Sequence, residues 1–175
     1  MIREILTEPN PILRKRSREV NPAQVSSREI QDAIQDLKDT LKNSEDGIGI
    51  AAPQASISLR IFIISEEAKH LDDERPPADK EWKQHVYINP IITKYARKKV
   101  EGIEGCLSVP GKYGVVERPE KVEITAYDDR GKPFIQGASK FHARVLQHEL
   151  DHLDGVLFVD KVKRFITVPD ERGRL

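Results

Sequence analysis

The chain has 175 residues, of which 33% are charged and 38% hydrophobic, and 29 Lys and Arg balance 29 Asp and Glu to a formal net charge of zero. This length suits one domain with a single core, so we expect one catalytic domain over residues 1–175. The neutral charge balance argues against DNA as a partner, and no apolar stretch approaches the ~18 residues of a membrane span.

The N-terminus and the cysteine content bear on the compartment. Residues 1–5 contain acid and lack the features of a signal peptide or a transit peptide. We therefore expect a cytoplasmic protein, as in bacteria, or one in an organelle interior whose transit peptide has been removed. The single cysteine, Cys106, excludes an internal disulfide bond and a zinc site built from cysteine pairs.

The first predicted element is an amphipathic helix over residues 27–43. Ser26 to Glu29 has the pattern of a capping box, and apolar residues follow at helical spacing, namely Ile30, Ala33, Ile34, Leu37 and Leu41. The helix leads into residues 46–54, a stretch rich in Gly and Ala that is unsuited to the interior of a helix or strand. Small residues there let the backbone come close to another group.

Strands are predicted in the middle of the chain. Residues 60–64 form an apolar run of strand length, residues 66–84 are predicted as a polar surface loop, and further strands are predicted over residues 86–93 and 94–100. Residues 122–127 and 133–139, with a turn at 129–131, predict a β-hairpin. A last helix is predicted over residues 139–154, ending at Gly155. The order indicates an α+β fold with mostly antiparallel sheets packed around the C-terminal helix.

The C-terminal helix carries an H-E-x-x-H pattern at His148, Glu149 and His152. In a helix the two histidines lie about 40° apart on one face, so they can bind one metal ion, and Glu149 can reach a water on that metal without being a ligand. Both histidines fall on the apolar side of the helix, where an unpartnered imidazole is costly to bury. Arg144, Gln147 and Asp151 share the remaining, polar side.

Two histidines leave the site one protein ligand short, and three candidates are open. A metzincin pattern needs a third histidine where the chain has Phe158, so that interpretation fails. Glu171 stands downstream, as in thermolysin-like proteases, but Gly155 and Pro169 argue against a further packed helix to carry it. Cys106, between predicted strands, is the best candidate, because a thiolate completes a Cys-His-His tetrahedron with water in the open fourth position.

Three separated motifs resemble the three signature motifs of peptide deformylases, in that family's order. They are Gly47-Ile48-Gly49-Ile50-Ala51-Ala52-Pro53-Gln54, Glu104-Gly105-Cys106-Leu107-Ser108 and Gln147-His148-Glu149-Leu150-Asp151-His152-Leu153. These enzymes remove the N-formyl group from the initiator methionine of nascent chains in bacteria and organelles. Some members add a C-terminal helix, whereas residues 168–173 here favour a short extended tail.

The resemblance implies a set of metal ligands, Cys106, His148 and His152. The metal in that family is natively Fe(II), and Zn, Ni or Co are alternative occupants. The resemblance also implies that a metal-bound water attacks the formyl carbon, with Glu149 as general base and then general acid.

The remaining roles also follow from the resemblance. The Gln54 side-chain amide and the Leu107 backbone N–H would stabilise the oxyanion. Ile48, Gly49 and Gly105 would pair through their backbones with the extended peptide. The methionine side chain would occupy an apolar pocket, for which the candidates are Ile48, Glu104, Phe141 and Val145.

The expected substrates are N-formylmethionyl nascent peptides, and the ribosome near its exit tunnel is a further expected partner. Lys161, Lys163 and Arg164 are candidates for contact with ribosomal RNA, although a solvated face is the preferred interpretation. Two other classes stay open. One is a small H-E-x-x-H zinc protease that depends on Glu171, and the other is a non-catalytic binding module stapled by a metal.

Overall fold

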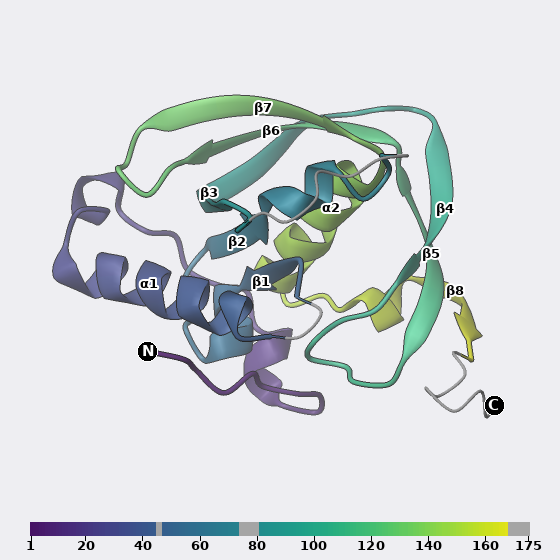
Figure 1. The fold of residues 1–175 in the computed structure, drawn as a ribbon, viewed down its shortest axis with the longest axis horizontal. Helices are drawn as coiled ribbons and strands as arrows, with labels where there is room; N and C mark the ends of the chain where they lie inside the picture. The colour runs from purple at the N-terminus through teal and green to yellow at the C-terminus, as the bar shows by residue number, and fades with distance from the viewer. Residues whose placement is uncertain (45–46, 74–80, 168–175) are drawn as a thin grey trace.

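The computed structural model describes residues 1–44, 47–73 and 81–167, and these form two helices and two antiparallel sheets (Figure 1). The helices are α1 (Arg28–Lys42) and α2 (Lys140–Leu153). One sheet has the order β1-β2-β3-β6-β7, with β1 (Gly49–Ala51), β2 (Ile61–Ser65), β3 (Gln84–Tyr95), β6 (Lys121–Tyr127) and β7 (Pro133–Ser139). The other has the order β4-β5-β8, with β4 (Lys99–Glu104), β5 (Tyr113–Pro119) and β8 (Val162–Ile166). The predicted α+β class is confirmed.

Short 3-10 helices connect several of these elements. They are η1 (Pro11–Arg14), η2 (Pro22–Gln24), η3 (Ala52–Ala55), η4 (Glu66–Lys69) and η5 (Phe158–Asp160). The predicted loop over residues 66–84 therefore begins with η4, and its residues 74–80 lie outside the described residues. The predicted extended tail and Glu171 also lie outside them. In the described part of the chain, no helix has the length and apolar character to cross a bilayer.

The helix α1 has nearly the predicted ends, but its cap differs from the prediction. Ser27 is the N-cap and its side chain accepts a hydrogen bond from the Ile30 backbone N–H. Glu29 is thus at the second helical position, so the capping box predicted from Ser26 does not form. The apolar face of α1 packs against β1 and β2.

The strand β2 is buried on both faces, which explains its uninterrupted apolar sequence. Ile61 and Ile63 belong to the core under α1, whereas Phe62 and Ile64 belong to the core under α2. Alternate side chains of a strand point to opposite faces, so one short strand contributes to both cores. Figure 1 shows the result: α1 lies outside the larger sheet, and α2 runs through the centre of the molecule.

The helix α2 has the predicted location, and Gly155 follows its end with φ of +75°. Its predicted polar side, however, is largely buried. Arg144 and Gln147 are only 8% and 5% exposed, because the smaller sheet covers this side of the helix. A helix that packs between two sheets has no fully solvated side, and its polar residues must find partners within the protein.

The strand predicted over residues 94–100 overlaps β4 but has the wrong bounds. The strand β3 continues to Tyr95, and β4 begins only at Lys99. The strand β3 contains a bulge at Asn89-Pro90, where the pairing with β6 shifts and Asn89 adopts φ of +49°. The Asn89 side chain stabilises this bulge by donating to the Val20 carbonyl and accepting from the Val20 N–H.

Three strands were not predicted. The Gly- and Ala-rich stretch forms the short strand β1. Glycine is tolerated in this strand because, among the described residues, β1 pairs only with β2 and lies at the sheet edge. The strands β5 and β8 pair with each other in the smaller sheet. β8 carries Lys163 and Arg164 on exposed positions, and this charge conceals its strand character in the sequence.

His142, on α2, gives the fold a dependence on acid. It is 8% exposed, and burial, with the charge of Lys69 nearby, lowers its pKa from 6.5 to about 4. Below the ordinary pKa, His142 is protonated in the unfolded chain but stays neutral in the folded chain. The contribution of His142 to the free energy of unfolding is therefore fully present above about pH 6.5 and is lost towards pH 4. We predict that His142→Leu loses about 2 kcal/mol less stability than the unmodified chain between about pH 7.5 and pH 4.5, measured by urea unfolding. Equal losses in the two proteins would contradict this.

Candidate metal centre

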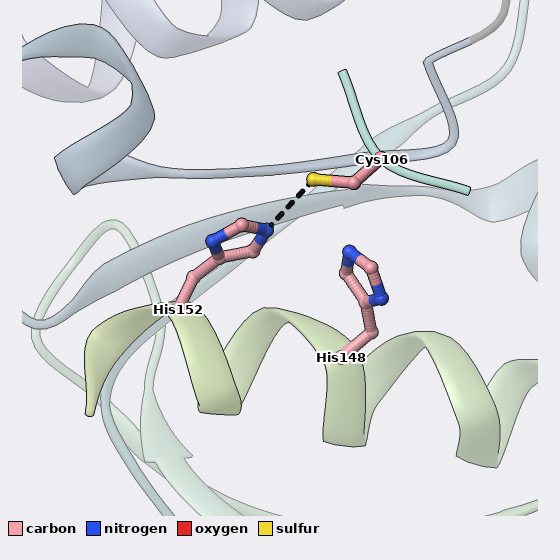
Figure 2. Close-up of side chains that lie close together, drawn as sticks. All are labelled: Cys106, His148 and His152. Carbon is pink, nitrogen blue, oxygen red and sulfur yellow. Dashed lines mark hydrogen bonds between the residues drawn. The ribbon is translucent and has the colours of Figure 1, made fainter. Parts of the chain in front are cut away.

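Three side chains from two separate parts of the chain converge beside α2. His148 and His152 come from one side of the helix, and Cys106 comes from the segment between β4 and β5 (Figure 2). Their potential ligand atoms all lie within 4.8 Å of one another, and the Cys106 Sγ is 3.1 Å from the His152 Nε2. One thiolate and two imidazoles are a donor set suited to Fe(II), Co(II), Ni(II) or Zn(II).

Burial of these groups supports the same interpretation. His152 is 1% exposed, and its Nδ1 has no hydrogen-bond partner within the described residues. Two neighbouring imidazoles and a thiol are costly to bury without a ligand in common. The residues present therefore fit a divalent metal ion.

The carboxylate of Glu104 fixes the orientation of His148. Glu104 is 6% exposed, and its Oε2 lies 3.0 Å from the His148 Nδ1. Arg118 donates to both carboxylate oxygens, over 2.6 and 2.9 Å, and Arg144 donates to Oε1 over 2.7 Å. Burial alone would raise the pKa of Glu104, but the hydrogen bonds from Arg118 and His148 hold this pKa well below its ordinary value. An ionised Glu104 keeps the proton of His148 on Nδ1, which leaves Nε2 free for a metal.

Sequence reasoning did not identify Arg118 or Arg144 as part of the site. Arg118 lies in β5, a strand that was not predicted, and it also binds Asp151 over 2.8 Å. Arg144 lies on the side of α2 that the sequence predicts only as polar. Nothing local in the sequence joins either arginine to Glu104, because the contacts depend on how the smaller sheet packs against α2.

Glu149 is buried directly beside the candidate metal ligands. It is 4% exposed, its Oε2 has no hydrogen-bond partner within the described residues, and burial raises its pKa to about 7. Gly49 of β1 lies against this carboxylate. A Cβ at position 49 would come within 2.6 Å of the Glu149 Oε1, so the glycine provides the room that Glu149 occupies.

Gln54, in η3, is held in place from both ends of its amide. Its Oε1 accepts from the Ala51 backbone N–H over 2.8 Å, and its Nε2 donates to the Ser108 Oγ over 3.1 Å. The same Nε2 lies 3.6 Å from the Cys106 Sγ. The amide N–H group is therefore fixed beside the thiol rather than free to rotate.

These groups meet at a cavity of about 420 Å³. Its walls include every site residue expected from the sequence except His152, namely Ile48, Gly49, Gln54, Glu104, Gly105, Cys106, Leu107, Phe141, Val145, His148 and Glu149. Residues that were not expected also line it, including Arg144, Ile103 and Tyr113. The Tyr113 ring packs on Gly105, where a Cβ would come within 2.7 Å of it.

Comparisons with known proteins point to one family. The chain matches the sequence model of a family described as polypeptide deformylase over residues 2–166. It is 37% identical to a peptide deformylase of Leptospira biflexa over 162 residues, which cover 93% of this chain and 88% of the relative. It is 39% identical to peptide deformylase 1A, chloroplastic/mitochondrial, of Arabidopsis thaliana over 165 residues, covering 91% of this chain but only 61% of the relative.

A solved relative has the same fold. The class I type b peptide deformylase from Acinetobacter baumannii, solved with Met-ala-ser bound, superposes with a TM-score of 0.80 at 32% identity and covers 93% of this chain and 99% of that chain.

The cluster leads to a prediction about metal content. We expect Cys106→Ser and His148→Ala to lose most of the divalent metal that copurifies with the unmodified chain, because each removes one of three ligands. His70→Ala, which changes a histidine outside the cluster, should retain the metal. Elemental analysis of the purified proteins measures this, and full metal content in Cys106→Ser would rule out the thiolate as a ligand.

Proposed function

The chain belongs to the polypeptide deformylase family, and we propose that it hydrolyses the N-formyl group from the formyl-methionine that begins newly synthesised polypeptides. The observation that carries this proposal is the meeting of Cys106, His148 and His152 beside a cavity that also holds a buried carboxylate. The peptide Met-ala-ser bound to the Acinetobacter baumannii relative is the type of product this reaction would leave. We propose that residues 1–175 act as one catalytic domain.

Cys106, His148 and His152 would hold one divalent metal ion, Fe(II) or alternatively Zn, Ni or Co. When bound, the metal supplies Lewis acidity, which lowers the pKa of a water molecule. Glu104 acts through His148 as a positioning residue, because its ionised carboxylate holds the imidazole in one tautomer. We therefore assign the Glu104 carboxylate to His148 rather than to direct contact with methionine.

Glu149 would transfer the proton during hydrolysis. It takes a proton from the attacking water and passes it to the amine as the formyl C–N bond breaks, so that formate and a free N-terminus result. Two observations support this role: the carboxylate is buried at the cavity wall, and its Oε2 has no partner among the described residues. A carboxylate engaged in ion pairs, like Glu104, would be much harder to protonate.

Two donors would stabilise the negative charge that develops on the formyl oxygen. The Gln54 Nε2 is fixed next to Cys106, and the backbone N–H of Leu107 belongs to the next residue in the chain. Donors that are held in place before the reaction cost no reorganisation when the charge develops. The contacts of Gln54 with Ala51 and Ser108 provide this rigidity.

The peptide would bind as an added strand. Within the described residues the free edge of β1 carries Gly49 next to Ile48 on the cavity wall, and Gly105, on the segment after β4, lines the same cavity. Backbone pairing with Ile48, Gly49 and Gly105 reads no side chains, which suits an enzyme that must accept many nascent chains. Ile48, Phe141 and Val145 would surround the methionine side chain.

We propose action in the bacterial cytoplasm or an organelle interior, close to the ribosomal exit tunnel. The residues considered for RNA contact are engaged elsewhere. Lys161 binds Asp151, and Lys163 and Arg164 bind Glu101. These ion pairs favour the solvated-face interpretation and give no support to RNA binding by the three residues.

The central test uses formyl-Met-Ala-Ser as substrate. We expect metal-loaded protein to release formate, and Glu149→Gln to lower kcat by about 10²-fold or more while keeping its metal, because only the proton transfer is removed. Glu29→Gln, on the exposed side of α1, is the control and should match the unmodified chain. Protein that leaves this peptide intact but cleaves internal bonds of casein would instead be a protease.

Gly49 offers a second, purely steric test. We predict that Gly49→Ala lowers kcat by about 10²-fold, because the new methyl group must displace the Glu149 carboxylate. Gly137→Ala, in β7, is the matched control because a Cβ there meets nothing within 4 Å. Similar kcat values for the two variants in the formate assay would show that Gly49 does not shape the site.

A further inference from the structure

We propose that Arg144, seated over Gly102, closes the pocket for the methionine side chain and limits how long a side chain it accepts. This inference rests on the proposed function, since it concerns the same cavity. It assigns specificity to two residues that the sequence motifs do not include.

Arg144 belongs to the face of α2 that lines the cavity. The lining residues on this helix are Phe141, Arg144, Val145, His148 and Glu149, which follow each other at intervals of three, one, three and one residues. This is the spacing of one helix face, so Arg144 stands beside Val145 and about one turn from His148. A guanidinium is thus part of a wall that is otherwise mostly apolar.

Hydrogen bonds fix the position of the Arg144 side chain. Its Nη1 donates to the Glu104 Oε1 over 2.7 Å and to the Val116 carbonyl over 2.9 Å, and its Nη2 donates to the Val100 carbonyl over 2.9 Å. The acceptors lie on β4 and β5, so the side chain joins both strands to α2. Moving it would leave a buried cation without its acceptors and would remove one of the donors to the ionised Glu104, which is unfavourable.

Gly102 makes this position possible. It lies in β4 opposite Val116, and a Cβ at position 102 would come within 2.7 Å of the Arg144 Cζ, Nε and Nη2. The guanidinium therefore occupies the space of the missing side chain. Gly102 itself is not part of the cavity wall, so a side chain there would act on the pocket only by displacing Arg144.

The pair defines two opposite perturbations of one wall. Removing the Arg144 side chain opens space towards β4 and lengthens the pocket. Adding a methyl group at Gly102 displaces the guanidinium from its position over the glycine and shortens the pocket. A residue that only stabilised the fold would change the affinity for all peptides alike.

The test measures binding of the deformylated product, Met-Ala-Ser, and of analogues with ethionine or norvaline in place of methionine, by calorimetry on the metal-loaded protein. One methylene in an apolar pocket changes affinity by about tenfold or more. We expect Arg144→Ala to raise the affinity for the ethionine peptide, relative to that for Met-Ala-Ser, by about tenfold. We expect Gly102→Ala to raise the affinity for the norvaline peptide, relative to that for Met-Ala-Ser, by a similar factor. Gln147→Ala is the control, because Gln147 is equally buried on α2 and binds the Pro119 carbonyl but lies outside the cavity wall.

Each outcome decides the question. Unchanged affinity ratios in both variants, or no binding of any of the three peptides, would overturn the inference. Gly102→Ala retains the arginine and its acceptors, so it tests the wall even if Arg144→Ala does not fold. If the ratios shift as expected while formyl-Met-Ala-Ser is not hydrolysed, the pocket assignment stands and the proposed reaction fails.

Discussion

The buried carboxylate of Glu104 is the interaction on which the site depends. It sits at the end of β4 and binds Arg118 of β5 and Arg144 and His148 of α2. The two arginines offset part of the cost of burying one negative charge, and Arg118 also binds Asp151. Through these contacts the smaller sheet is held against the helix, so the segment with Cys106 is fixed opposite the histidines. One carboxylate thus orients a histidine and positions a thiol at once.

The two sheets have different tasks around α2. The larger sheet forms an apolar core with the helix, in which Phe62 of β2, Ile124 of β6 and Leu146 of α2 are fully buried. The smaller sheet instead meets the polar side of the helix and supplies acceptors, such as the Pro119 carbonyl for Gln147. A helix with one apolar side and one hydrogen-bonded side can lie at the centre of the fold. It can then hold titratable side chains in the protein interior.

Much of this could be predicted from the sequence because the signals are local. The spacing of His148 and His152 and the apolar periodicity of α1 report helix geometry directly, and the hairpin of β6 and β7 follows from alternation and a turn. The smaller sheet could not be predicted, because β5 and β8 carry charges whose partners are distant in sequence. The roles of Arg118 and Arg144 follow from that sheet, and so they were hidden with it. Glu104 was found as a cavity residue, but its partners became visible only with the fold.

The shortness of β1 has a consequence beyond catalysis. A free sheet edge invites pairing with any extended chain, including another copy of the same protein, and proteins often protect such edges. β1 is three residues long, and its Ile50 and Ala51 are fully buried, so an added strand gains only a few backbone hydrogen bonds and no exposed apolar partner. An edge of this length is too short to support stable aggregation. A backbone edge this short would also limit the hydrogen bonds available to the peptide that is proposed to bind there, so weak backbone pairing and protection from self-association would have the same structural origin.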